Sequence, residues 1–317
     1  MAVKVVATAF GGPEVLSVVE TEIPPPGPGE VTVSVRAAGV NPVDYKLFGG
    51  GMGAGPGRFP MPVGLELAGV VTAVGPGAEG PAGPIGVGDE VVVFPATGAY
   101  ADTVTAAAAT VVPRPPAVGW PEAGGILLVG ATAVHALGVV GAEAGETLLV
   151  HGAAGSVGQV AVQLAVAAGV TVVGTAAEPN HELLRGYGAI PVTYGAGLAE
   201  RVRAVAGDTV DAAIDCVGTD EAVDTSIELV ADRARIVSIA AGHRADTGIR
   251  LIGRFPGADP GTDIRAGAWR VLLPAAAEGR LRIVVARTYA LSAAAEAIRF
   301  VQDGHAAGKV VLLPDSA

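Results

Sequence analysis

The chain is poor in charged residues. Asp, Glu, Lys and Arg make up 16% of its 317 residues, and the acidic ones prevail to give a net charge of −11. An acidic surface repels the phosphate backbone of nucleic acids, so we expect no nucleic-acid partner. The same charge disfavours a polybasic membrane-binding surface, so we expect no membrane partner either. Small molecules remain the expected ligands.

Cysteine is nearly absent as well. Cys216 is the only one, so the chain cannot form an internal disulfide, and we expect a cytoplasmic location. We interpret Cys216 as a small buried residue rather than a nucleophile. The first residues, MAVKVVATAFGGPEVL, lack the apolar core and cleavage site of a secretory signal peptide. We therefore expect no such peptide.

One long stretch, residues 147–177, contains no Asp, Glu, Lys or Arg. Its length alone would suit a membrane-spanning helix. Four glycines interrupt it, however, and divide it into a short apolar run, a turn, a helical pattern and a second short run. These are Gly152, Gly155, Gly158 and Gly169. The stretch therefore predicts a buried strand–helix–strand unit.

Glycine is abundant instead, with 47 residues, and half of the chain is hydrophobic. This composition is typical of an α/β protein with buried parallel strands. The first third predicts short strands at 3–9, 15–20, 31–37, 70–74 and 90–94. Two glycine-rich segments, 48–59 and 76–88, are expected to be loops, the first at the rim of a substrate site and the second on the surface.

From about residue 120 the pattern changes to strands that alternate with helices, which is typical of a doubly wound sheet. The expected strands are 148–151, 170–174, 191–194, 211–216, 234–240 and 249–252. The remaining residues predict helices at 268–278 and 292–303 and strands at 284–289 and 309–313.

The most specific motif is LLVHGAAGSVG at 148–158, where an apolar strand runs through small residues directly into an amphipathic helix. Small residues let the backbone approach a pyrophosphate closely, and the first N–H groups of the helix neutralise its charge. The spacing is A-x-G-x-x-G, with Ala153 in the first glycine position. This motif predicts a dinucleotide site.

The end of the second strand favours NADPH over NADH. An Asp or Glu commonly holds the ribose hydroxyls of NAD at this place. Here the strand ends at Gly174 and Thr175, followed by two alanines, which leaves room for a 2′-phosphate. A cationic clamp is not evident, since the nearest candidate, Arg185, lies a helical turn further along.

Several segments together resemble the medium-chain dehydrogenase/reductase superfamily, in its zinc-free quinone oxidoreductase (ζ-crystallin-like) branch. They are GVNPVD (39–44), PVGLELAGVV (62–71), GDEV (88–91), GAYAD (98–102), HGAAGSVG (151–158), DCVG (215–218) and GKVVL (308–312). The resemblance implies an α/β fold in which a Rossmann doubly wound parallel sheet is inserted into a GroES-like β-rich catalytic domain.

The implied domains are 1–121 and 265–317 for the two parts of the catalytic domain and 122–264 for the Rossmann domain, with the active site in the cleft between them. The resemblance also implies a homodimer formed through residues 235–252.

Zinc members of the superfamily hold the metal with Cys and His side chains, and use four clustered cysteines for a second zinc. The segment 41–44 has no Cys, and Cys216 lies in an expected strand, so we expect no zinc. The remaining chemistry is hydride transfer from the nicotinamide to a quinone or an α,β-unsaturated carbonyl.

The resemblance assigns residues to this chemistry. Asn41 and Thr132 would lie near the nicotinamide, and Lys309 would reach the cofactor from the C-terminal segment. The expected pyrophosphate contacts are Gly152, Ala154, Gly155, Ser156, Val157 and Gly158, the ribose contacts Gly174, Thr175 and Tyr194, and the other nicotinamide contacts Val217, Ser238, Ile239 and Ala240.

Tyr45 is the first candidate proton donor and His135 the second. Tyr45 could instead be a packing residue, His135 a buried imidazole, and the proton could come from water. Two other functions stay open: a pathway-specific enoyl or enone reductase with a larger substrate, and a dinucleotide-binding protein without turnover. The low aromatic content, 4%, leaves few rings to stack on a quinone and keeps the last one open.

Overall fold

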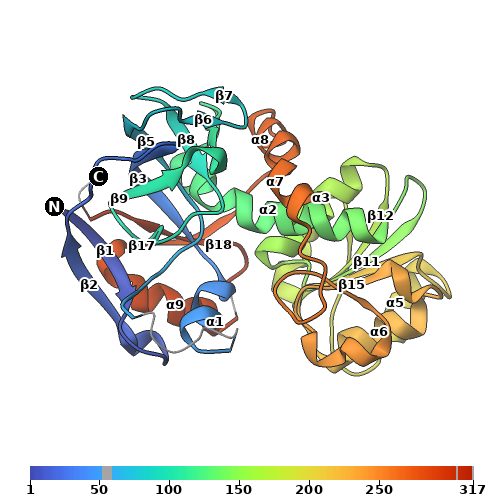
Figure 1. Cartoon of the computed structure of the whole chain (residues 1–317). Helices are drawn as coiled ribbons and strands as arrows, with labels where there is room; N and C mark the ends of the chain where they lie inside the picture. The colour runs from blue at the N-terminus through green and yellow to red at the C-terminus, as the bar shows by residue number, and fades with distance from the viewer. Residues whose placement is uncertain (52–58, 305, 316–317) are drawn as a thin grey trace. The chain divides into compact units, whose positions relative to one another are not determined.

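The computed structural model of the chain describes residues 1–51, 59–304 and 306–315 (Figure 1). They form two compact units. The first unit comprises Met1–Leu128, Leu272–Ala277 and Ile283–Ala317, and the second comprises Val129–Val271 and Glu278–Arg282. The domain limits expected from the sequence stay a prediction.

The first unit is mostly antiparallel β-sheet. Its main sheet has the order β10-β8-β5-β3-β18-β17, with β9 also paired to β3, and a three-stranded sheet has the order β2-β1-β4. The bounds are β1 Ala2–Ala7, β2 Leu16–Thr21, β3 Glu30–Val40, β4 Met61–Pro62, β5 Leu67–Val74, β6 Glu79–Gly80, β7 Gly83–Pro84, β8 Glu90–Val93, β9 Thr103–Ala107, β10 Val111–Pro113, β17 Val285–Ala290 and β18 Lys309–Leu313. The helices are α1 Pro42–Phe48, α9 Ala294–Gln302, the beginning of α2 Trp120–Val140 and, from Leu272 on, α8 Trp269–Ala277.

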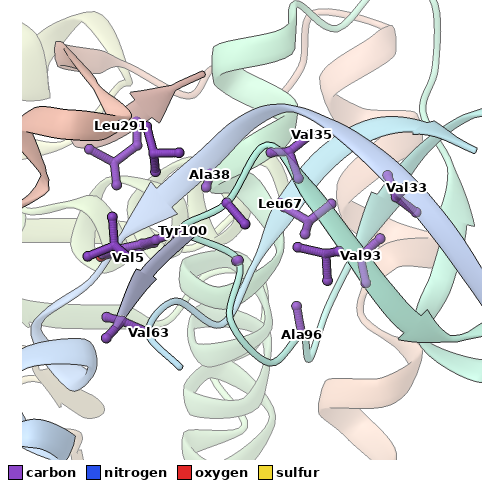
Figure 2. Close-up of a cluster of buried hydrophobic side chains, with 14 of the residues drawn as sticks. Val5, Val33, Val35, Ala38, Val63, Leu67, Val93, Ala96, Tyr100 and Leu291 are labelled. Atoms are coloured by element: carbon purple, nitrogen blue, oxygen red, sulfur yellow. The ribbon is translucent and has the colours of Figure 1, made fainter. Parts of the chain in front are cut away.

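The core of the first unit lies under the main sheet. Alternate residues of β3 point inward, as expected for a strand with one buried face, and Val33 and Val35 meet Leu67 of β5 and Val93 of β8 (Figure 2). Strand β18 joins the other side of β3 as an antiparallel neighbour, with Val310 opposite Val40. This pairing brings Lys309 next to the start of α1.

The second unit holds a parallel sheet in the order β13-β12-β11-β14-β15-β16. Its bounds are β11 Thr147–His151, β12 Thr171–Thr175, β13 Ile190–Val192, β14 Ala212–Asp215, β15 Ile236–Ser238 and β16 Arg250–Leu251, with helices α3 Ser156–Ala167, α4 His181–Gly186, α5 Leu198–Ala206, α6 Asp220–Leu229, α7 Thr262–Gly267 and the beginning of α8. Numbered along the chain this is the order 3-2-1-4-5-6, which reverses between β11 and β14. The expected doubly wound sheet is confirmed.

The uncharged stretch 147–177 folds as strand β11, helix α3 and strand β12, as its glycines predicted. Among the helices of the described residues, a different one is long and apolar enough to cross a membrane, judged by length and composition. It is α2, and 72% of its most apolar window is buried in the protein.

Some expectations of secondary structure were wrong. The expected strand 234–240 is only Ile236–Ser238, because the Asp232 side chain accepts the Ala234 N–H in a short 3₁₀ turn before it, and Ser238 caps the turn after it. The expected strand 191–194 ends at Val192. The segment 76–88 contains the small hairpin of β6 and β7, and of the expected loop 48–59, residues 52–58 lie outside the described residues.

Candidate cofactor-binding site and a buried polar cluster

The glycine loop leaves β11 through a backbone that only glycine adopts easily. Gly152 has φ +68°, and its carbonyl accepts the Gly155 N–H at 3.0 Å. A Cβ at Gly158 would lie 2.3 Å from this same carbonyl oxygen. The tight turn therefore depends on glycine at both positions.

The loop ends at the N-terminus of α3. Gly155 is the N-cap with an extended backbone, and as a glycine it has no side-chain oxygen to cap the first turn. The positive end of a 12-residue helix thus follows a backbone without bulky side chains at Gly152, Ala153, Ala154 and Gly155. These residues fit the pyrophosphate of a dinucleotide, because it needs close backbone approach and N–H donors.

Thr175 at the end of β12 holds the loop from its other side. Its carbonyl accepts the Ala153 N–H at 3.0 Å, and its hydroxyl accepts the Gly152 N–H at 3.2 Å. The residue is 2% exposed, so the hydroxyl of this expected ribose contact faces the glycine loop. Gly174 must also be small, since a Cβ there would lie 2.8 Å from that of Ala153.

Arg185 of α4 and Arg201 of α5 follow β12 in the sequence. Arg185 pairs with Glu182, and Arg201 donates to the carbonyls of Thr193 at 2.9 Å and Gly195 at 2.6 Å. Arg201 thereby fixes the loop that carries Tyr194, which is 56% exposed. Sequence reasoning had considered Arg185 and missed Arg201, because no local pattern links it to this loop.

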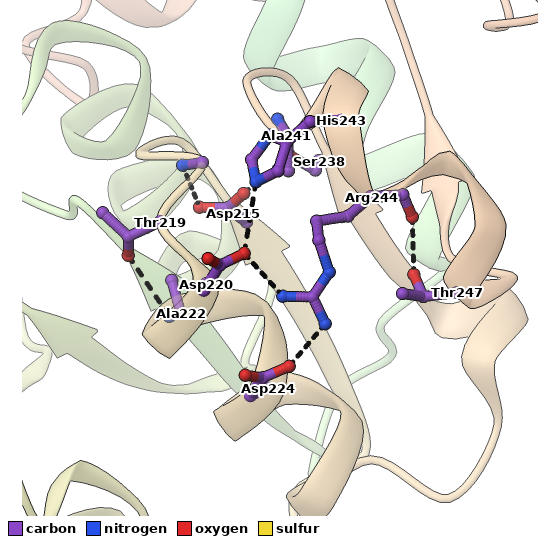
Figure 3. Close-up of polar contacts among 11 residues, drawn as sticks. Asp215, Thr219, Asp220, Ala222, Asp224, Ser238, Ala241, His243, Arg244 and Thr247 are labelled. Atoms are coloured by element: carbon purple, nitrogen blue, oxygen red, sulfur yellow. Dashed lines mark hydrogen bonds and ion pairs between the residues drawn. The ribbon is translucent and has the colours of Figure 1, made fainter.

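The ends of β14 and β15 are joined by Asp215 and Ser238 (Figure 3). One carboxylate oxygen of Asp215 accepts the N–H groups of Val217 at 2.8 Å and Gly218 at 2.9 Å, and the other accepts the Ser238 hydroxyl at 2.6 Å. Ser238 in turn accepts the Ala240 N–H at 3.1 Å. Both side chains are fully buried.

This arrangement brings four expected nicotinamide contacts together on two adjacent turns: Val217, Ser238, Ile239 and Ala240. The Ser238 side chain is engaged by Asp215, whereas the Val217 side chain is 48% exposed. Sequence reasoning included Asp215 in the DCVG segment but gave it no role. A lone carboxylate at the end of a buried strand, before a Gly-containing turn, was the available signal.

In the first unit, Lys309 lies at the centre of a buried cluster. Its ammonium group contacts Glu66 Oε1 at 2.8 Å, the Val40 carbonyl at 3.3 Å and the Asn41 side-chain oxygen. Lys309 is 2% exposed and Glu66 is fully buried. All three N–H donors of Lys309 therefore have partners within the first unit.

The Asn41 amide is engaged in the same cluster. Its nitrogen donates to Glu66 Oε1 at 3.0 Å and to the Gly39 carbonyl at 3.3 Å, while its oxygen accepts from Lys309. The second carboxylate oxygen of Glu66 accepts the Leu128 N–H at 2.9 Å. The structure thus brings the expected residues Asn41 and Lys309 together through Glu66, and their contact with a cofactor stays a prediction.

Asp44 lies next to this cluster, in the first turn of α1. Its Oδ2 accepts the Asn41 N–H at 2.9 Å and the Tyr100 hydroxyl at 2.8 Å, whereas Oδ1 has no hydrogen-bond partner among the described residues. Burial raises the pKa of Asp44 to about 7, and burial together with Asp44 raises the pKa of Tyr100 well above its usual value. The neighbouring Tyr45 is half-buried against the core, and this burial raises its pKa.

His135, the second candidate donor, is fully buried in the second unit. Its Nδ1 accepts from Arg265 Nε at 3.2 Å, which leaves Nε2–H to donate to Asp259 at 3.2 Å. Arg265 also donates to the Thr132 hydroxyl at 3.2 Å. The expected residues Thr132 and His135 are therefore joined by Arg265, which sequence reasoning missed because it lies 130 residues away.

The described residues, 1–51, 59–304 and 306–315, include no group of three or more His, Cys, Asp or Glu side chains that could hold a metal ion. The sole cysteine, Cys216, is not suited to metal binding or nucleophilic attack, since both need a thiolate. Cys216 is partly buried, and burial raises the pKa of its thiol well above the usual value, so a thiolate is disfavoured.

Comparison with known proteins identifies both parts of the chain. Residues 27–125 match the family described as alcohol dehydrogenase GroES-like domain, and residues 187–312 match the family described as zinc-binding dehydrogenase. The chain is 33% identical to a segment of the phthioceranic/hydroxyphthioceranic acid synthase of Mycobacterium tuberculosis, over 91% of its own length but only 14% of the synthase. It thus spans about a seventh of that relative.

Two other proteins match along their whole length. The quinone oxidoreductase of Pseudomonas aeruginosa is 32% identical and covers 99% of this chain, which in turn covers 100% of that protein. The structure of mycobacterial Rv1454c complexed with NADPH has a TM-score of 0.86 and 30% identity, over 99% of this chain and 100% of that one. The GroES-like and Rossmann parts expected from the sequence are therefore present, and the chain belongs to the medium-chain dehydrogenase/reductase superfamily, in its quinone oxidoreductase branch.

Proposed function

We propose that this protein is a zinc-independent reductase that binds NADPH and reduces a quinone or an α,β-unsaturated carbonyl. The observation that carries the proposal is the loop from Gly152 to Gly158, in which two hydrogen bonds to Thr175 and close backbone packing fix a small-residue turn at the start of α3. Bound NADPH would supply the hydride.

The chain's own residues would bind the dinucleotide and orient its nicotinamide. The backbone of Gly152 and Ala154–Val157 would hold the pyrophosphate, and the turns after β14 and β15 would shape the nicotinamide side, because Asp215 keeps both rigid. The end of β12 has no carboxylate to repel a 2′-phosphate, and the similar mycobacterial protein is complexed with NADPH, so we favour NADPH over NADH.

Tyr45 is the preferred proton donor. Its hydroxyl belongs to a half-buried side chain, whereas both ring nitrogens of the fully buried His135 have partners. Asn41 and Lys309 would act as a rigid pair held by Glu66. We also propose a cytoplasmic homodimer, formed through residues 235–252, which include the edge strand β16.

The test is to mix purified protein with NADPH and to follow its oxidation with a panel of quinones, enones and enoyl thioesters. We expect turnover with quinones or small enones, and faster turnover with NADPH than with NADH. Turnover of long-chain enoyl thioesters alone would favour the second candidate, a tailoring enoyl reductase, which the match to a segment of a mycobacterial synthase supports. Cofactor binding without oxidation across the panel would contradict both.

A pair of glycine variants tests the cofactor site itself. Gly158→Ala forces a Cβ against the Gly152 carbonyl, so it should distort the loop and weaken NADPH binding by at least about tenfold, the effect of ~1.4 kcal/mol. Gly186→Ala is the matched control, because Gly186 lies in α4 with no atom within 4 Å of the added Cβ. Equal NADPH affinity in the two variants would show that the loop is not the binding site.

A further inference from the structure

His151, the last residue of β11, is buried directly beneath the glycine loop and has defined partners on both ring nitrogens. Nε2 lies 3.1 Å from the Ser226 hydroxyl of α6, and Nδ1 lies 3.4 Å from the Thr175 hydroxyl of β12. The side chain is 1% exposed. The proposed function leaves this residue without a role.

The hydrogen bonds around His151 have one consistent direction. The Ser226 hydroxyl donates to the Ala222 carbonyl at 2.8 Å, so it accepts from His151 Nε2–H. In a neutral imidazole Nδ1 is then the acceptor, and it accepts from the Thr175 hydroxyl. With its proton directed to His151, the Thr175 oxygen presents a lone pair to the Gly152 N–H at 3.2 Å.

Thr175 is therefore the link between the imidazole and the loop. The alternative rotamers of its hydroxyl or side chain would remove the acceptor from the Gly152 N–H, which begins the turn that leads to α3. Because the Gly152 N–H would then lack its acceptor, the loop would relax toward other conformations.

We propose that His151 is a positioning residue for dinucleotide binding: as a neutral acceptor it fixes the Thr175 hydroxyl, which in turn holds the glycine loop in the shape that receives the pyrophosphate. This inference rests on the proposed function, since it assigns the loop to the cofactor. It adds a residue that touches neither cofactor nor substrate.

The charge state that this role requires is the one the surroundings favour. The acidic groups that face His151 are Asp215 of β14 and Glu221 of α6, and both would favour its protonation. Burial has the larger, opposite effect and lowers the pKa of His151 to about 4, while the adjacent Cys216 thiol stays neutral. His151 therefore remains an acceptor at Nδ1 across the neutral pH range.

Two amide variants separate the two ring nitrogens. In His151→Asn the side-chain oxygen occupies the place of Nδ1 and can still accept from Thr175, whereas in His151→Gln the amide reaches the place of Nε2 and serves Ser226 instead. We expect the Kd for NADPH, measured by fluorescence titration, to stay within about threefold for Asn and to rise about tenfold for Gln. A purely structural histidine would change the unfolding midpoint in both variants and the Kd in neither.

A second pair keeps the test independent of how well these variants fold. Thr175→Ser retains the hydroxyl and should weaken NADPH binding less than Thr175→Val, which removes the hydroxyl and should bind about tenfold more weakly than the wild type. Affinity for NADH, which lacks the titrating 2′-phosphate, should be constant from pH 5 to 8 in the wild type.

Equal Kd values for the Asn and Gln variants, or for the Ser and Val variants, would overturn the inference and leave the proposed function standing. So would an inflection in NADH affinity near the usual histidine pKa. A wild-type protein with no affinity for either dinucleotide would overturn both.

Discussion

At the scale of single residues, the first unit concentrates ionisable groups where water is excluded. Lys309, Glu66 and Asp44 are each at most 2% exposed, and Asn41 connects them. One cation faces two carboxyl groups, and the closer one, Glu66, takes the ion pair. Asp44 is left with Tyr100 and a backbone N–H, which explains why burial dominates its pKa.

Asp44→Asn should change how stability depends on pH. The folded-state pKa of Asp44, about 7, lies above its usual value of 3.8, so between these values the folded chain keeps a proton that the unfolded chain has lost. The contribution of Asp44 to the free energy of unfolding therefore falls as pH rises through this window, by up to about 4 kcal/mol. Asn cannot ionise, so the variant should gain stability relative to the wild type from pH 4 to 7.

Urea denaturation of the wild type and of Asp44→Asn, at half-unit steps of pH, measures the difference between their free energies of unfolding. Above pH 7 the two curves should run parallel. Parallel curves over the whole range would mean that Asp44 ionises normally in the folded protein, and would contradict the expected shift.

The residue-scale features that could be predicted from the sequence are the ones with a local pattern. The spacing of Gly152, Gly155 and Gly158 after an apolar run identified the loop and the following helix, and α3 begins where it was expected. The contacts of His135 with Asp259 and Arg265 had no such pattern, because these two residues lie 124 and 130 positions from His135. Such pairs depend on tertiary packing, which one sequence does not reveal.

At the scale of elements, α2 is the least expected part of the fold. Its 21 residues include Gly124, Gly125, Gly130 and Gly138, which lower helix propensity and obscure any amphipathic period. The structure explains two of these glycines by close approach. A Cβ at Gly124 would lie 2.7 Å from the Ala37 carbonyl oxygen of β3, and one at Gly125 would lie 2.5 Å from Lys309 Cγ.

Two alanine substitutions in α2 should therefore have opposite effects. Gly124→Ala must displace the β3 backbone and should lower the free energy of unfolding by about 1–3 kcal/mol. Gly138→Ala meets only Ile264 Cδ1, at an ordinary 3.6 Å, and should raise it by about 0.5–1 kcal/mol through helix propensity.

Thermal unfolding followed by circular dichroism distinguishes the two variants. Stabilisation by both alanines would show that α2 does not approach β3 as closely as the structure indicates.

At the scale of the whole molecule, residues 187–312 match a family described as zinc-binding dehydrogenase, whereas the part of the chain that the structure describes includes no group of three or more His, Cys, Asp or Glu side chains that could hold a metal ion. The second unit could be predicted, because in a doubly wound parallel sheet short apolar strands alternate along the sequence with amphipathic helices. The first unit could not be predicted in this way. Its sheet combines strands from both ends of the sequence, as in the pairing of β18 with β3. Only the family resemblance indicated that one domain is built from both chain ends.

The purified protein should contain less than about one zinc ion per ten chains, and treatment with a chelator should leave NADPH oxidation unchanged, because three or four suitable ligands are needed to hold the metal. Elemental analysis and assays before and after dialysis against EDTA provide the measurement. Stoichiometric zinc, or activity that a chelator abolishes and added zinc restores, would contradict zinc independence.

The pairing of β18 with β3 has a consequence for the order of events during biosynthesis. Lys309 and Val40 are 269 positions apart, and the whole of the second unit, Val129–Val271 and Glu278–Arg282, is translated between them. The parallel sheet of the second unit can thus form on the ribosome while Glu66 still lacks Lys309 and β3 still lacks its pairing with β18. Nascent chains stalled before Lys309 should accordingly display a protease-resistant second unit beside a first unit that is still open to cleavage.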